Sequence, residues 1–114
     1  MELELRIVQD EDRPVLRRLV QFYRYDWSEL DGSNVDRHGE YLHHYFDEYF
    51  LGEDRVGWLF RVDGNLAGFA LLYIGEPHDV AEFFVMRKYR RLGVGRQAAR
   101  KLFSGYTGAW TVRE

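Results

Sequence analysis

Three apolar segments follow one another in the middle of the chain, and the short turns between them constrain the fold more than any other feature of the sequence. Residues 55–62 and 66–74 are rich in Val, Leu, Phe and Tyr, and residues 63–65 between them read Asp-Gly-Asn. These residue types tolerate the positive φ of a tight hairpin turn. Residues 79–86 form a third segment after a turn at 75–78. Strands joined by tight turns pair antiparallel, so the sequence predicts a sheet of consecutive strands.

Weaker patterns before these segments indicate one strand and two helices. Apolar and charged residues alternate over residues 3–7, as in a half-buried strand. Residues 10–12 are acidic and precede an Arg-Pro pair, which suits the first turn of a helix that runs to about residue 30. From about residue 35 to residue 50, apolar and aromatic residues at helical spacing predict a second helix.

The end of the chain completes the element order. A glycine-rich turn precedes helical spacing over residues 94–103, and residues 109–112 begin a last strand. The order β-α-α-β-β-β-α-β describes an α+β fold, with a mixed, mostly antiparallel sheet flanked by helices. The β-α-β passage from residue 79 to residue 112 is expected to add one parallel strand pair. With 114 residues, the chain predicts a single domain over residues 1–114.

Composition excludes several classes of protein. The chain has no cysteine and four histidines, which removes disulfides, thiolate zinc sites and a cysteine nucleophile, and we expect no metal site. No apolar run approaches the roughly 20 residues that cross a bilayer, and the first residues lack the pattern of a secretion signal. We therefore expect a soluble, cytoplasmic protein with no membrane partner.

Charge is distributed unevenly along the chain. Residues 1–82 carry 8 basic and 18 acidic side chains, whereas residues 83–114 carry 8 basic side chains and 1 acidic one. The C-terminal part is therefore expected to attract anions, although a charged run is most often a solvated face.

The strongest chemical signal is a glycine-containing turn between a strand and a helix. The turn and the basic residues before it are Arg87, Lys88, Arg90, Arg91, Gly93, Val94 and Gly95. Backbone N–H groups, the positive end of a helix and side-chain cations meet there, which favours a phosphate site. The alternative is a helix start with solvated arginines. The chain lacks GxxxxGK[ST] and GxGxxG, which excludes a P-loop and a dinucleotide fingerprint.

The run Arg90-Arg91-Leu92-Gly93-Val94-Gly95 resembles the Q/R-x-x-G-x-G/A acetyl-CoA signature of the GNAT N-acetyltransferases, with Val85 five residues before it. The expected element order also looks like that fold over nearly the whole chain, as far as its fifth strand. The resemblance implies a GNAT-like acyl-CoA N-acyltransferase fold. It also implies an enzyme that transfers the acetyl group of acetyl-CoA to a primary amine, on a small cationic molecule or a protein, by direct attack.

By this resemblance, the residues that bind acetyl-CoA fall into two groups. Backbone amides of the turn would wrap the pyrophosphate, and the backbone at the preceding strand end would pair with the pantetheine arm. The first group is Arg91, Leu92, Gly93, Val94, Gly95 and Arg96, with Arg90 as a side-chain donor; the second is Phe84, Val85 and Met86. Candidates for the 3′-phosphate are Arg87, Lys88, Arg96 and Arg100.

Attack of an amine on a thioester needs a base and a donor to the developing oxyanion. Glu82 is the only acid inside its strand, and it is the candidate catalytic base, directly or through a water. The alternative is that Glu82 pairs with a basic side chain and only holds structure. Asp79 is the second candidate, although its place at the strand start favours a turn cap. A backbone amide near Val85 would polarise the thioester carbonyl.

By analogy with the family, the acceptor is expected at the first two helices and their connection. Aromatic residues and carboxylates there suit a cation such as a polyamine, an aminoglycoside or a lysine side chain, or they are core and surface. The residues are Tyr23, Tyr25, Trp27, Tyr41 and Tyr45, with Asp26, Glu29, Asp31 and Glu40. His38, His43 and His44 are expected at the surface or lining the pocket. Adjacent histidines on a helix point to different sides, which argues against a shared metal.

The chain departs from the family pattern at its end. Such domains usually continue with another helix and two strands, which carry the tyrosine that protonates the leaving thiolate. No residue here matches that tyrosine. We therefore expect either a shortened domain or a homodimer that completes the sheet, since the last strand would keep an open edge.

Two other functions stay open. A non-catalytic coenzyme A-binding module would bind acetyl-CoA without transferring its acetyl group. A nucleic-acid surface is the weaker alternative, because residues 87–101 hold seven basic side chains but the rest of the chain is strongly acidic. We expect no nucleic-acid partner.

Overall fold

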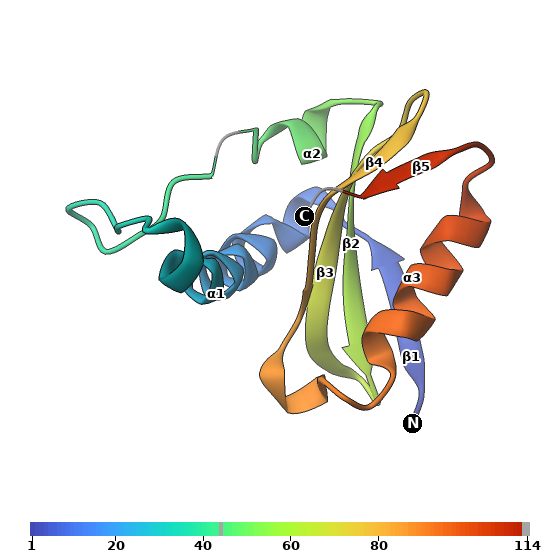
Figure 1. Ribbon diagram of the computed structural model, residues 1–114, viewed down its shortest axis with the longest axis horizontal. Helices are drawn as coiled ribbons and strands as arrows, with labels where there is room; N and C mark the ends of the chain where they lie inside the picture. Colours follow the sequence, from blue (N-terminus) through green and yellow to red (C-terminus); the bar gives the residue numbers. More distant parts are fainter. Residues whose placement is uncertain (44, 113–114) are drawn as a thin grey trace.

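The computed structural model describes residues 1–43 and 45–112, which form one five-stranded sheet with helices on both faces (Figure 1). The elements are β1 (Leu3–Ile7), a 3-10 turn (Asp10–Asp12), α1 (Arg13–Asp31), α2 (Glu48–Leu51), β2 (Arg55–Val62), β3 (Asn65–Tyr73), β4 (His78–Val85), a 3-10 turn (Arg87–Tyr89), α3 (Val94–Gly105) and β5 (Trp110–Val112). The predicted α+β fold and element order are confirmed.

The strands lie in the sheet in their sequence order, β1-β2-β3-β4-β5. The first four are antiparallel neighbours, and β4 and β5 are parallel, as the sequence predicts. β5 pairs only with His78, Asp79 and Val80 at the start of β4. Beyond Val80, the edge of β4 that faces away from β3 therefore has no strand beside it among the described residues.

Two apolar layers hold the helices on opposite faces of the sheet. α1 buries Leu16, Leu19 and Val20 against one face, and α3 buries Val94, Ala98 and Leu102 against the other. Sheet residues alternate between the layers, as period-two side chains must. The α1 face receives Leu59, Phe69, Leu71 and Phe84, and the α3 face receives Phe60, Ala70, Leu72 and Val80.

The predicted helix over residues 35–50 is wrong for most of its length, because only Glu48–Leu51 is helical. Two residues, Gly39 and Tyr45, have positive φ values of 77° and 68°, which no α-helix accommodates. The Asp36 carboxylate also accepts the backbone N–H groups of His38 and Glu40, at 2.8 and 3.1 Å. Such local bonds offer the backbone an alternative to the helix and outweigh the apolar spacing.

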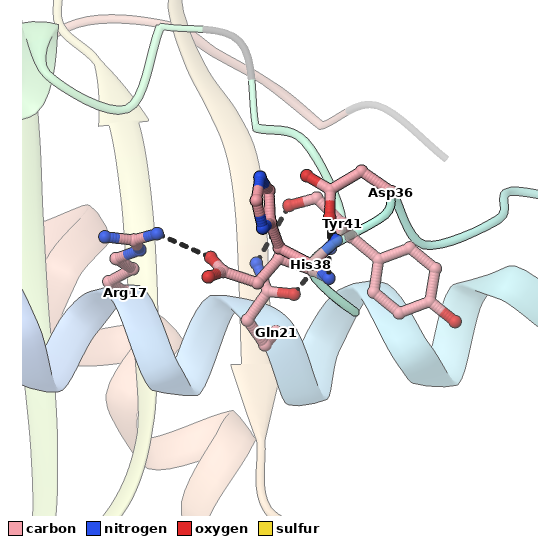
Figure 2. Close-up of polar contacts among 6 residues, drawn as sticks. Arg17, Gln21, Asp36, His38 and Tyr41 are labelled. Carbon is pink, nitrogen blue, oxygen red and sulfur yellow. Dashed lines mark hydrogen bonds and ion pairs between the residues drawn. The ribbon is translucent and has the colours of Figure 1, made fainter.

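The irregular segment between α1 and α2 is tied to α1 by polar contacts (Figure 2). The Gln21 side-chain amide donates to the Tyr41 carbonyl at 2.9 Å and accepts the Tyr41 N–H at 2.7 Å. One turn earlier, Arg17 forms an ion pair with Glu40 at 2.6 Å. These contacts give the segment a defined path across α1 without a helix of its own.

A β-bulge in β4 changes which face its side chains occupy. Leu71 pairs with Glu82 and Leu72 with Val80, so Ala81 is an extra residue in the strand. Without the bulge, Glu82 would share the α3 face with Val80; the extra residue instead turns Glu82 toward the α1 face, as bulges typically redirect side chains. Asp79 lies on the same side, and both carboxylates line one cleft.

No helix within residues 1–43 and 45–112 combines the length and the apolarity that a bilayer crossing needs.

Gly68 on β3 is the position where the sheet tolerates no side chain. A Cβ there would overlap the carbonyl oxygen of Phe84 and lie 3.1 Å from the Cα of Val85, both backbone atoms of β4. We expect Gly68→Ala to lower the free energy of unfolding by about 1–3 kcal/mol or more, because neither strand can yield without losing pairing. Urea unfolding measures this.

Gly105→Ala is the matched control, since nothing lies within 4 Å of a Cβ at Gly105. Equal stability of the two variants would contradict the described approach of β3 to β4.

Candidate active site

The turn between β4 and α3 presents backbone N–H groups at a helix end. Gly93 caps α3 with a φ of 81°, and Arg91 also has a positive φ, 67°. The Gln97 N–H bonds to the Gly93 carbonyl at 3.0 Å and starts the helical ladder. The amides of Val94, Gly95 and Arg96 come before that bond, so they have no partner inside the helix. Their dipoles favour an anion, as the sequence predicts for this turn.

Both glycines of this turn have room for a Cβ atom. A Cβ at Gly95 would lie 3.6 Å from the Val85 side chain and 3.7 Å from the Phe83 ring, which are ordinary contact distances. A Cβ at Gly93 would approach only the Gln97 side chain, at 3.7 Å. Gly93 is needed for its positive φ, whereas packing within the protein does not require a glycine at 95. The shape therefore fits a ligand whose phosphates lie against the backbone.

Arg90, the predicted phosphate donor, is held by the protein. Its guanidinium forms an ion pair with Asp26 of α1 at 2.6 Å, and its Nε donates to the Val85 carbonyl at 2.8 Å. Arg87 binds the other oxygen of Asp26 at 2.9 Å. The hydrogen bond from Arg90 lowers the pKa of Asp26, with a further contribution from Arg87. The side chains of Lys88, Arg91 and Arg96 are exposed beside the turn.

Beyond the bulge, the backbone polar groups of β4 point alternately to the two edges of the strand. The Phe84 carbonyl lies against Gly68 of β3, and the Met86 N–H donates to the Ala67 carbonyl at 2.7 Å. Strand alternation then directs the polar groups of Phe83 and Val85 to the opposite edge, which β5 leaves open. Of the three predicted pantetheine partners, Val85 thus faces the open edge, while Phe84 and Met86 face β3. Phe83, which the sequence analysis does not single out, also faces the open edge, because the parity of the strand follows from the structure.

A cleft of about 500 Å³ lies on the α1 side of β4. Its lining residues are Arg24, Leu42, His43, Tyr45, Tyr49, Arg55, Tyr73, Asp79, Ala81 and Glu82. Glu82 Oε1 lies 2.9 Å from His43 Nε2, and the two side chains are 15% and 11% exposed. Glu82 therefore has a basic partner, as the structural alternative requires, and it also faces a cavity, as a catalytic role requires.

His43 is a site residue that sequence reasoning left aside as a surface or pocket-lining residue. It belongs to the irregular segment, whose path depends on contacts with α1 rather than on its own periodicity. Its ring also contacts Phe46 and Tyr49 edge-on, with centroids 6.0 and 6.4 Å apart. No spacing in the sequence connects residue 43 to residue 82. His44 lies outside the described residues.

The predicted acceptor residues divide between several places. Tyr45 lines the cleft, whereas Tyr23, Asp26 and Trp27 line a smaller one of about 280 Å³ beside Val85. Three of the others, Tyr25, Glu29 and Asp31, are exposed. The Tyr41 backbone is hydrogen-bonded to Gln21, and Glu40 forms an ion pair with Arg17. Burial, and secondly the charge of Glu82, raise the pKa of Tyr23 to about 12. The Tyr23 hydroxyl is therefore protonated at neutral pH.

No group of three or more metal-ligating side chains is found among residues 1–43 and 45–112.

The Asp26 bridge predicts a pH-dependent contribution to stability. A carboxyl whose pKa is lowered by folding stabilises the protein above its unfolded pKa, about 4, and loses that effect as the pH falls through the folded pKa. We expect Asp26→Asn to lower the free energy of unfolding at pH 7 by about 1 kcal/mol or less, because the arginines are partly exposed. The difference from wild type should shrink below pH 4.

Unfolding curves at several pH values check this, with Glu29→Gln, an exposed acid one turn along α1, as the control. A deficit that stays constant down to low pH would contradict an ion-pair origin.

Comparisons with known proteins identify the family and the fold. A model of the acetyltransferase (GNAT) family matches residues 17–105. No curated protein matches the chain. Among solved structures, a ribosomal-protein-alanine N-acetyltransferase from Brucella melitensis is similar with a TM-score of 0.71 and 16% identity, over 99% of this chain and 80% of that chain.

Two further structures share the fold at similar distance. An aminoglycoside acetyltransferase from an uncultured soil metagenomic sample has a TM-score of 0.67 and 14% identity, over 98% of this chain and 77% of that one. A predicted acetyltransferase with acetyl-CoA from Clostridium acetobutylicum has a TM-score of 0.70 and 11% identity, over 99% and 81%. At such identities these likenesses concern the fold, and the family model covers most of the chain. The chain belongs to the GNAT acetyltransferase family.

Proposed function

We propose that this protein is an acetyl-CoA-dependent N-acetyltransferase that acylates a primary amine by direct attack. One observation carries the proposal: a single strand, β4, joins three features. The N-terminal turn of α3 lies beside Phe83 and Val85, whose backbone faces the open edge of the sheet. Glu82, the preceding residue, projects into the cleft on the α1 side. A phosphate site, an extended binding edge and a carboxylate thus follow one another over a short distance.

The turn and the open edge have the chemistry that coenzyme A requires. The amides of Val94, Gly95 and Arg96 would bind the pyrophosphate at the positive end of α3. The polar groups of Phe83 would pair with the pantetheine amides, as an added strand does. The exposed cations Lys88, Arg91, Arg96 and Arg100 are candidates for the 3′-phosphate.

The reaction proceeds in the cleft beside Glu82. The amine nitrogen attacks the thioester carbonyl carbon, the C–N bond forms, and the C–S bond breaks. Coenzyme A leaves as a thiolate and takes up a proton, and the amine gives its proton to the Glu82–His43 pair. The pair is suited to this because its atoms lie 2.9 Å apart and Glu82 Oε2 is buried with no partner among the described residues. A backbone N–H at Val85 would donate to the developing oxyanion.

The second candidate is a coenzyme A-binding module without transferase activity. The contact of Glu82 with His43 favours it, because a purely structural pair has the same geometry. It would bind acetyl-CoA and release no thiol with any amine. The cytoplasmic location and the homodimer across the open edge of β5 stay predictions.

Gly95→Asp separates a ligand role of the turn from a structural one. We expect the variant to be about as stable as wild type, because an acid suits the first turn of a helix and the Cβ lies at ordinary contact distances from its neighbours. Its affinity for acetyl-CoA should fall by about tenfold or more, since the carboxylate repels phosphates that lie against the backbone of the turn. Calorimetry measures the affinity.

Gly105→Asp, at the other end of α3, is the control and should leave the affinity unchanged. ATP and a short DNA duplex, titrated in the same salt, test the phosphate and nucleic-acid alternatives. Unaltered binding of acetyl-CoA to Gly95→Asp would remove the turn from the site.

Glu82→Gln tests the base. The substitution keeps the volume and removes the proton acceptor, so we expect kcat for thiol release to fall by about 10²–10⁴-fold while the Kd of acetyl-CoA stays unchanged. Glu53→Gln, an exposed acid outside the cleft, is the control. A rate within a factor of about two of wild type would show that Glu82 is structural.

A further inference from the structure

Three buried polar atoms without hydrogen-bond partners among the described residues belong to side chains of residues that line the cleft. They are Arg24 Nε, His43 Nδ1 and Glu82 Oε2. Buried polar groups are nearly always paired, and leaving one unpaired costs about 1–3 kcal/mol. Arg24 Nε is a donor, whereas Glu82 Oε2 can accept a hydrogen bond. A ligand that satisfies both must therefore carry an acceptor for the arginine and a donor for the carboxylate.

The cleft also contains charged groups of both signs. Two guanidinium groups, Arg24 and Arg55, and two carboxylates, Asp79 and Glu82, line one cavity. A cleft built for a cation alone would have carboxylates without guanidinium groups beside them, because like charges repel in a partly desolvated site. The acids and aromatic residues within residues 23–45 predict a cationic acceptor, whereas the cleft takes its carboxylates from β4 and its guanidinium groups from α1 and β2.

Arg55 is fixed in place by three tyrosine rings. Its guanidinium carbon lies 4.9 Å from the ring centre of Tyr45, 5.5 Å from that of Tyr73 and 5.8 Å from that of Tyr49. Glu48 holds its Nε at 3.3 Å, and only 25% of its side chain is exposed. Such a group loses little freedom when it binds an anion, and guanidinium groups bind carboxylates with paired hydrogen bonds.

Arg24 is held by one side-chain hydrogen bond. Its Nη2 donates to the Ser33 hydroxyl at 3.3 Å, just after the C-terminal end of α1. Its Nε is buried and has no partner among the described residues. The two arginines thus enter the lining of one cavity from α1 and from β2.

We propose that the acceptor is a small molecule of the amino-acid type, with a primary amine and a carboxylate. This inference rests on the proposed function, because it names the acceptor of that reaction. The amine lies at Glu82 Oε2, where it can lose its proton, and the carboxylate lies at Arg24 and Arg55. The volume of about 500 Å³ suits a molecule of this size. The reaction yields an N-acetyl amino acid and free coenzyme A.

Matched pairs of ligands test the carboxylate directly. The pairs are L-leucine with 3-methylbutylamine, L-phenylalanine with 2-phenylethylamine, and L-lysine with 1,5-diaminopentane. In each pair the two molecules differ only by the carboxylate. Calorimetry with the wild-type protein, with and without saturating coenzyme A, gives the Kd of each without turnover. We expect the amino acid of at least one pair to bind about tenfold or more tightly than its amine.

Two variants and one control assign the effect to the arginines. Arg24→Gln and Arg55→Gln should each weaken binding of the amino acid by about tenfold or more and leave binding of the amine within about twofold. Arg18→Gln, an exposed arginine of α1 outside the cleft, should change neither. Retained coenzyme A binding by each variant confirms that it is folded.

The proposal is overturned if every amine binds as tightly as its amino acid, if no amino acid binds, or if Arg24→Gln weakens both members of a pair equally. None of these results touches the proposed function, which fails instead if the wild-type protein binds no acetyl-CoA or releases no thiol with any amine. Because the titrations are also made without coenzyme A, the affinity for the amino acid is measured independently of coenzyme A binding.

Discussion

The site depends on how the backbone of β4 is hydrogen-bonded. β3 takes one edge of this strand along its length, while β5 takes the other edge only as far as Val80. The bulge at Ala81 falls where β5 ends, and it turns Glu82 toward α1 while Phe83 and Val85 present polar groups to the open edge. Because adjacent residues of a strand point in fixed alternation, one extra residue decides both the side of the carboxylate and the side of the binding edge.

Much of this arrangement could be predicted from the sequence. The hairpin at Asp63-Gly64-Asn65, the strand before the glycine turn and the start of α3 at Val94 follow from local turn chemistry and periodicity, which need no distant partner. The family resemblance of residues 90–95 rests on the same kind of local signal, because a phosphate site at a helix end needs only consecutive amides.

What could not be predicted depends on distant contacts. Residues 35–50 have helical spacing, yet other contacts set their path. The Asp36 carboxylate accepts the N–H of Glu40, and Gln21 and Arg17 of α1 bind the same segment. The meeting of His43 with Glu82 follows from that path, so no sequence pattern reports it. The role of Arg90 was likewise hidden, because its partner Asp26 lies 64 residues away. An arginine side chain can bind phosphate or pair with an acid, and the neighbouring sequence does not indicate which of the two it does.

One helix links the two halves of the site. Arg24 and Asp26 stand two residues apart on α1, so they leave the helix in different directions. Arg24 lines the cleft beside Glu82, and Asp26 binds both Arg87 and Arg90 next to the turn that precedes α3. An anion that binds at this turn competes with Asp26 for those arginines. Because one helix carries both residues, the Asp26 contact beside the turn and the Arg24 side of the cleft are fixed by the same element.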